Sequence, residues 1–146
     1  MANTVKNVHP YISKQFAVIF PGAAEGDTVD YAPACSSALL NPSSSTQTWK
    51  GGTPEAVFTD VTSPTYTFDV TIGQDWVDVE SFANYLEEHA GELIEDIAYT
   101  PRPGAPTWTF DAYVPPVPVG GNIDDWATAQ LSFPVVGSPV KTPAGA

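Results

Sequence analysis

The chain has 146 residues, of which 17 are acidic and 5 are basic, and its formal net charge is −12. This length fits a single domain, and the acidity excludes a protein that wraps a phosphate backbone, because such proteins gather Lys and Arg on one surface. The chain has one cysteine, which excludes an intrachain disulfide and a cysteine-based metal cluster.

Residues 1–30 are expected to form an N-terminal arm followed by the first strand. The opening sequence, MANTVKNVHP, has no apolar core, so we expect no signal peptide, and no apolar run approaches the ~18 residues of a membrane-spanning helix. Residues 1–14 are polar and barely periodic, whereas residues 15–20 have the composition of a strand. We therefore expect a protein that is synthesised in the cytoplasm and stays there until it is assembled into a larger structure.

Residues 31–140 are expected to form one mainly β domain. Fifteen prolines and eleven glycines separate short runs that are rich in Thr and aromatic residues, which is typical of antiparallel β-structure. Strands are predicted at residues 33–40, 46–50 and 93–100, and a short C-terminal tail is predicted at 141–146.

Two strands are predicted from nearly the same sequence, TYTFDVTI at 65–72 and TWTFDAYV at 107–114. In both, apolar and polar residues alternate with a period of two, which places one face on a core and the other on water. Asp69 and Asp111 fall at the same point of the polar face. A third alternating run, WATAQLSFPVV at 126–136, predicts another strand. Because a solenoid needs at least three repeats, the two copies indicate two strands of one sheet system.

The segment 79–90 has helical periodicity. Val79, Phe82 and Leu86 recur at helical intervals, and Asp78 is placed to cap the first turn. The pattern predicts one helix of about three turns, with these three apolar side chains packed on the sheet.

Residues 50–64, KGGTPEAVFTDVTSP, are predicted to form a long loop. A loop of this length in a small domain is usually functional or disordered. This loop carries Val57, Phe58 and Val61, and exposed apolar residues of this kind suggest that a partner buries them.

Candidate catalytic and metal-binding residues are few. His9 and His89 have no second ligand at metal spacing, and Cys35 lies in no nucleophile motif. Adjacent acidic residues occur at Glu87/Glu88, Glu95/Asp96 and Asp124/Asp125. A glycosidase would need two carboxylates that face each other across a cleft, and no pattern in the sequence supports such a pair. We therefore expect no enzymatic activity, no bound metal and no cofactor.

Four stretches occur in the order SSSTQTWKGGTPEAVF, SPTYTFDVTIGQDW, ESFANYLEEHAGE and ATAQLSFPVVGSPV. In this order they resemble the major tail tube protein of long-tailed bacteriophages. The resemblance runs from about residue 34 to residue 140. Its most specific parts are WKGG with the following FTD, and TIGQDW.

The resemblance implies a two-sheet β-sandwich or barrel with one flanking helix. It also implies that subunits form sixfold rings, which stack into a hollow tube in the tail of the virion. The implied partners are other copies of the chain, the tape measure, terminator and baseplate proteins of the tail, and DNA that passes without specific binding. The loop at 50–64 would reach into the adjacent ring, with Lys50, Val57, Phe58 and Val61 in that contact.

Asp69 and Asp111 are the candidate lumen-facing residues, because a basic wall would bind phosphates and an acidic wall would not. The alternative is that they cap a strand or face the outer solvent. Two other functions remain open. A monomeric immunoglobulin-like binding module, such as a virion decoration domain, would have no use for the 50–64 loop, and a ring protein of a secretion tube would share the same general fold.

Overall fold

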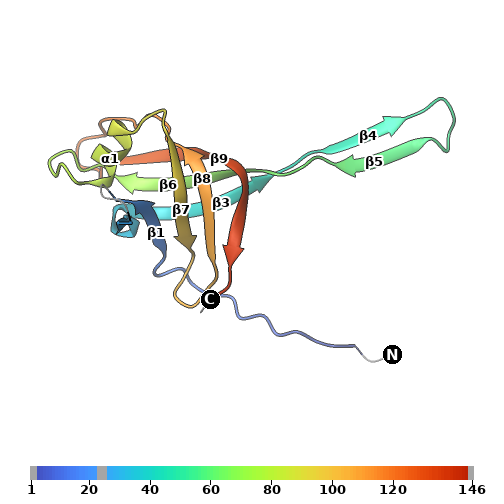
Figure 1. The fold of residues 1–146 in the computed structure, drawn as a ribbon, viewed down its shortest axis with the longest axis horizontal. Coiled ribbons are helices and arrows are strands. Elements are labelled where there is room, and N and C mark those ends of the chain that lie inside the picture. Colours follow the sequence, from blue (N-terminus) through green and yellow to red (C-terminus); the bar gives the residue numbers. More distant parts are fainter. Residues whose placement is uncertain (1–2, 23–25, 145–146) are drawn as a thin grey trace.

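The computed structural model describes residues 3–22 and 26–144, and its architecture is mainly β (Figure 1). Its strands are β1 (Ala17–Pro21), β2 (Thr28–Asp30), β3 (Cys35–Ser43), β4 (Thr46–Lys50), β5 (Val57–Val61), β6 (Thr65–Gly73), β7 (Leu93–Thr100), β8 (Thr107–Tyr113) and β9 (Thr128–Thr142). A 3-10 turn at Ala32–Ala34 and one short helix, α1 (Phe82–Glu88), complete the described elements. Seven strands form one antiparallel sheet in the order β2-β1-β7-β8-β9-β6-β3, and β4 pairs with β5.

The long strand β9 connects two halves of the seven-stranded sheet. Residues 128–134 pair with β6, and residues 135–142 pair with β8. In Figure 1, β9 runs along β6 and then turns down beside β8. Gly137 lies in the second half with a φ of 72°, a conformation that glycine adopts at little cost. The two halves of the sheet therefore face each other across one core.

Aromatic side chains from both halves fill this core. The Phe68 ring of β6 lies 5.1 Å from the Phe110 ring of β8, measured between centroids, and Phe20 of β1 lies 5.2 Å from Phe82 of α1. The period-two prediction for the three alternating strands is confirmed, since the central positions of their apolar faces are buried and the outer ones, such as Tyr66, Trp108 and Val135, are half-buried. The buried positions are Phe68, Val70, Ile72, Phe110, Ala112, Ala129, Leu131 and Phe133.

The mainly β prediction is confirmed, but closure into a barrel is not observed. Within the described part of the chain, β2 and β3 are the end strands of the sheet and do not pair with each other. The predicted tail at 141–146 is also wrong in its first two residues, because β9 continues to Thr142. Residues 3–16 of the predicted N-terminal arm form no helix or strand, and residues 1–2 and 145–146 lie outside the described residues.

The predicted helix at 79–90 is shorter than expected. Ser81 caps α1, because its hydroxyl oxygen accepts a hydrogen bond from the Asn84 N–H at 3.3 Å. Before it, the Asp78 carboxylate accepts from the Glu80 N–H at 3.0 Å and holds a turn that competes with helix. Val79 is 80% exposed, so its placement in the core is wrong.

The other two helix predictions are confirmed. Phe82 and Leu86 are both buried against the sheet, and Phe82 also stacks on Tyr31 with ring centroids 4.5 Å apart. The helix therefore covers one edge of the core with its single apolar face.

The predicted loop at 50–64 is wrong, because five of its residues form β5. Together with β4, whose predicted bounds 46–50 are confirmed, this strand makes a two-stranded hairpin. The hairpin projects from the body of the molecule (Figure 1), and we call residues 46–61 the arm. The sequence VFTDV has no period-two alternation of apolar and polar residues, so it did not predict a strand, and only the pairing with β4 distinguishes a strand from a loop.

Candidate functional site

The arm presents apolar side chains on both of its faces. Trp49 of β4 lies opposite Phe58 of β5 on one face, and these residues are 70% and 67% exposed. Because side chains alternate along a strand, Val57 and Val61 lie on the other face, where they are also exposed. The sequence prediction had grouped Val57, Phe58 and Val61 as one contact surface. The structure instead divides them between two faces.

Trp49 was not identified from the sequence as a candidate. Its significance comes from the register that places it beside Phe58, and no pattern within TQTWK itself reveals that partner. A Trp–Phe pair of this exposure on a projecting hairpin is typical of a surface that another molecule covers.

The tip of the arm is narrow. The Gly51 N–H donates to the Ala56 carbonyl at 2.6 Å, and a Cβ atom at Gly51 would lie only 2.6 Å from the Ala56 Cβ. A glycine is therefore required where the two strands come closest. Lys50, the last residue of β4, lies opposite Val57 and extends from the arm into solvent.

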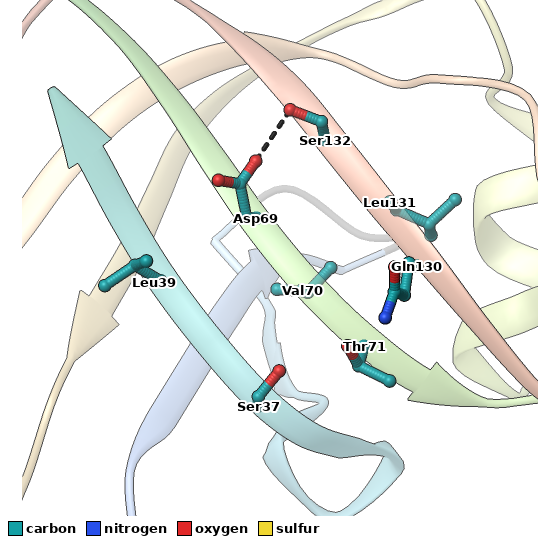
Figure 2. Close-up of a pocket in the computed structure, with 8 residues that line it drawn as sticks. All are labelled: Ser37, Leu39, Asp69, Val70, Thr71, Gln130, Leu131 and Ser132. Carbon is teal, nitrogen blue, oxygen red and sulfur yellow. Dashed lines mark hydrogen bonds between the residues drawn. The ribbon is translucent and has the colours of Figure 1, made fainter. Parts of the chain in front are cut away.

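A second candidate surface is the polar face of the half-sheet made of β3, β6 and residues 128–134. Cross-strand pairing places Asp69 between Leu39 and Ser132 in one row. The Ser132 hydroxyl donates to the Asp69 carboxylate at 2.6 Å, and both line a shallow depression of about 490 Å³ (Figure 2). These strands contain no Lys, Arg or His, and Asp69 is their single charged residue.

Asp111 lies in the other half of the sheet, where it supports a β-bulge. The pairing of β7 with β8 shifts register between Ile94 and Ile97. Within this shift Asp96 has a φ of 60°, and its N–H donates to the Asp111 carboxylate at 3.0 Å. Asp69 and Asp111 are therefore equivalent in sequence but have different neighbours.

Replacing Asp111 with alanine is expected to lower the free energy of unfolding by ~1 kcal/mol, because the Asp96 N–H loses its acceptor. Asp111→Asn keeps an acceptor oxygen at the same position and should be closer to the wild type. Urea denaturation of the two variants measures the difference. Equal stability of the two variants would show that this hydrogen bond does not stabilise the bulge.

A third candidate surface lies at the end of the molecule beside α1, away from the arm (Figure 1). The loop after β6 and the loop before β9 meet there through Gln74. Its amide group donates to the carbonyls of Gly120 and Thr128, at 3.0 and 2.9 Å. On the loop before β9, Ile123 and Trp126 are each 93% exposed. Neither residue is a candidate from the sequence: Ile123 precedes the alternating run at 126–136, and Trp126 is the first residue of that run, before β9 begins.

The titratable residues considered for chemistry have local structural roles. Burial, with a smaller contribution from the Asp30 carboxylate, raises the pKa of Cys35 to about 12, so this thiol stays protonated at neutral pH. His89 follows α1 as its C-cap residue, and its Nδ1 lies 2.7 Å from a Glu92 carboxylate oxygen. In residues 3–22 and 26–144, no three His, Cys, Asp or Glu side chains gather in a way that could hold a metal ion. None of the described helices is long and apolar enough to cross a membrane.

Comparison with models of protein families finds no match. Comparison with curated proteins finds no significant match either. The function is therefore inferred from the fold and from these three surfaces.

Proposed function

We propose that this protein is a structural virion protein that self-assembles into stacked hexameric rings, and that these rings form the tail tube of a long-tailed bacteriophage. The observation that carries the proposal is the arm. Its two strands pair only with each other among the described elements, and both of its faces carry exposed apolar side chains. A monomeric binding module would gain nothing from such an arm, whereas a stacking subunit would bury it in its neighbour.

The positions of the apolar surfaces support stacking along one direction. The arm projects from one end of the molecule, and the loop before β9, which carries the exposed Ile123 and Trp126, lies at the other end (Figure 1). Two different surfaces at opposite ends give a heterologous contact, and such contacts generate open-ended assemblies when the rotation between subunits does not close.

The edges of the half-sheet support lateral association into rings. Strand β6 lies between β3 and residues 128–134 of β9. In the described part of the chain, β3 pairs with no other strand, and residues 128–134 also pair with no other strand, because β8 pairs with β9 only from residue 135 onward. Both outer edges of this three-stranded half-sheet are thus available to a neighbouring copy. Pairing around a ring would complete a two-sheet subunit fold with a shared inner barrel, and it would remove edges that otherwise promote aggregation.

The polar face of this half-sheet has the chemistry that a DNA conduit requires. It carries the Asp69 carboxylate and no basic residue, so it would not retain phosphates through counterion release. Of the two aspartates we assign Asp69 to the lumen wall, because it lies on this half-sheet, whereas Asp111 lies on β8 in the other half, beside the β7 bulge. In this role the protein needs no cofactor and no catalytic group.

The proposal also assigns partners and a location. Copies of the chain would be synthesised in the host cytoplasm and assembled into the virion tail. The terminator and baseplate proteins would meet the two ends of the tube, and the tape measure protein and then DNA would occupy its lumen.

Electron microscopy of the purified protein in negative stain tests the proposal directly. We expect hollow tubes, or stacked rings with sixfold symmetry in end views, with a yield that rises with protein concentration. A protein that stays monomeric by light scattering at all soluble concentrations, and that shows no rings in micrographs, would contradict it.

Asp69→Lys is expected to slow DNA ejection from phage that carry it. The tails should look normal, because Asp69 lies on the face away from the core, but the lumen would carry rings of positive charge that bind a passing phosphate backbone. High salt should partly restore the rate, since it screens these contacts. Asp69→Asn, which keeps the acceptor for Ser132 without the added charge, is the matched control. Rapid ejection from Asp69→Lys particles would place this face outside the lumen.

A further inference from the structure

A pocket of about 590 Å³ lies between α1 and the strands β1 and β2. These elements are in the half of the molecule that faces away from the arm (Figure 1). Its size is within the range of about 300–1,000 Å³ that is typical of binding pockets. The residues that determine its chemistry are Val29, Tyr31, Val79, Glu80, Tyr85 and Glu88.

The pocket combines aromatic and aliphatic walls with two carboxylates. The rings of Tyr31 and Tyr85 lie 5.4 Å apart, and Val79 adds an exposed aliphatic side chain. Burial first, and then the nearby charges of Glu80 and Glu88, raise the pKa of Tyr31. Both carboxylates therefore act on the same part of the pocket.

The described lining of the pocket includes one histidine, His89. No Lys or Arg is among its lining residues, and the His89 ring is held by the Glu92 carboxylate at 2.7 Å. In the described residues Glu80 and Glu88 form no ion pair. The pocket thus fits a group that has an apolar body and a cationic end.

The tip of the arm combines an apolar side chain with a cationic one. Lys50 and Val57 lie opposite each other on one face of the arm, and both are exposed. Asp60 belongs to the other face, and Glu55 lies in the turn beyond the strands. The other basic residues are elsewhere: Lys6 and Lys14 precede β1, Arg102 lies over the Tyr11 ring, and Lys141 lies over the Trp108 ring.

The arm is long enough to present this tip to another molecule. The chain runs eight residues from the end of β3 at Ser43 to Gly51, which corresponds to ~26 Å at ~3.3 Å per residue. On the described residues its strands pair only with each other, so the tip stands clear of its own subunit (Figure 1).

We propose that the pocket receives the arm tip of a second copy of this chain. Val57 packs against Val79 and Val29, and the Lys50 ammonium group lies between the carboxylates of Glu80 and Glu88. This inference rests on the proposed function, since it requires copies that stack along the long axis. It adds the acceptor surface, and it explains why a chain with so few cations places one at the end of its arm.

A charge exchange tests the contact. Lys50→Glu should raise the protein concentration needed for tube formation by at least ~10-fold, because like charges across an interface are repulsive. The double variant E80K/E88K should have the same defect. Combining all three substitutions should restore tubes. Lys6→Glu makes the same charge change in the segment before β1 and should have little effect. Circular dichroism and thermal melting should show every variant folded, because all four side chains are exposed.

A cysteine pair provides a second measurement that does not depend on charge. Lys50→Cys combined with Glu88→Cys should form disulfides between copies in assembled tubes and give a ladder of covalent oligomers on a non-reducing gel. Each single variant should give no ladder.

The outcomes separate the two proposals. If the wild type forms no rings or tubes, the proposed function fails. If the wild type and Lys50→Glu form tubes equally well, or if the cysteine pair gives no ladder in tubes, the acceptor pocket is wrong and the tube function stands. Rescue by the charge exchange together with the ladder would establish the contact.

Discussion

Replacing Phe58 with aspartate is expected to abolish long tubes and leave the subunit folded. Phe58 is 67% exposed and lies opposite Trp49 on the projecting arm, so the core does not depend on it. If a neighbouring copy covers this face, the substitution places an unpaired charge in a desolvated contact, at a cost of several kcal/mol per site. Because every copy repeats the defect, the effect on assembly should be close to complete.

Sedimentation and negative-stain electron microscopy measure this outcome. Phe58→Leu keeps an apolar side chain and should still assemble, which makes it the matched control. Trp49→Asp changes the other half of the same face and should behave like Phe58→Asp. Normal tubes from Phe58→Asp would mean that the Trp49–Phe58 face stays exposed in the assembly.

Replacing Leu86 with alanine is expected to lower the free energy of unfolding by ~2–5 kcal/mol. Leu86 is 0% exposed and lies on the single face of α1 that packs on the sheet, so its removal leaves a cavity. A loss of this size is a large fraction of the ~5–15 kcal/mol that stabilises a typical domain. We therefore expect reduced folding of the subunit and not a selective defect in assembly.

Val79→Ala is the matched control for this experiment. Val79 belongs to the same predicted helical pattern but is exposed, and its truncation should change stability by no more than ~0.5 kcal/mol. Urea denaturation of both variants measures the difference. If Val79→Ala were as destabilising as Leu86→Ala, the segment before α1 would be packed on the core and the helix would begin earlier than described.

The residues of the core were predictable because their pattern is local. Alternation with a period of two gives the buried and exposed faces of β6, β8 and the first half of β9 without any knowledge of their partners. The bounds of β4 and β7 were also predicted correctly, at 46–50 and 93–100. In β6, β8 and the first half of β9, the same residues that favour extended backbone also face the core, so local preference and burial agree.

The start of the helix was not predictable from periodicity alone. Val79 fits the apolar pattern, yet hydrogen bonds from backbone N–H groups to the side chains of Asp75 and Asp78 hold residues 75–80 in turns. The cap moves to Ser81 as a result. Short polar side chains can accept hydrogen bonds from backbone N–H groups and so stabilise turns in place of a helix. The spacing of apolar residues gives no information about these hydrogen bonds.

The candidate surfaces depended on pairing between distant segments. The sequence indicated an exposed apolar segment at 50–64, but only the register of β4 with β5 reveals an arm and places Trp49 beside Phe58. The acceptor pocket likewise gathers residues from β2, α1 and the turn before α1. Such surfaces arise between strands and loops whose relative positions no single segment specifies.

By itself, the sequence determined a mainly β chain, the alternating faces of its strands and the identical positions of Asp69 and Asp111 within their strands. Only the tertiary structure decided how these two aspartates differ. The register of β6 with β9 places Asp69 beside Ser132 in one half of the sheet, and the pairing of β8 with β7 places Asp111 beside the bulge in the other half. The physical reason is that the direction of a side chain follows from its own strand, whereas its neighbours follow from the pairing of strands far apart in the chain.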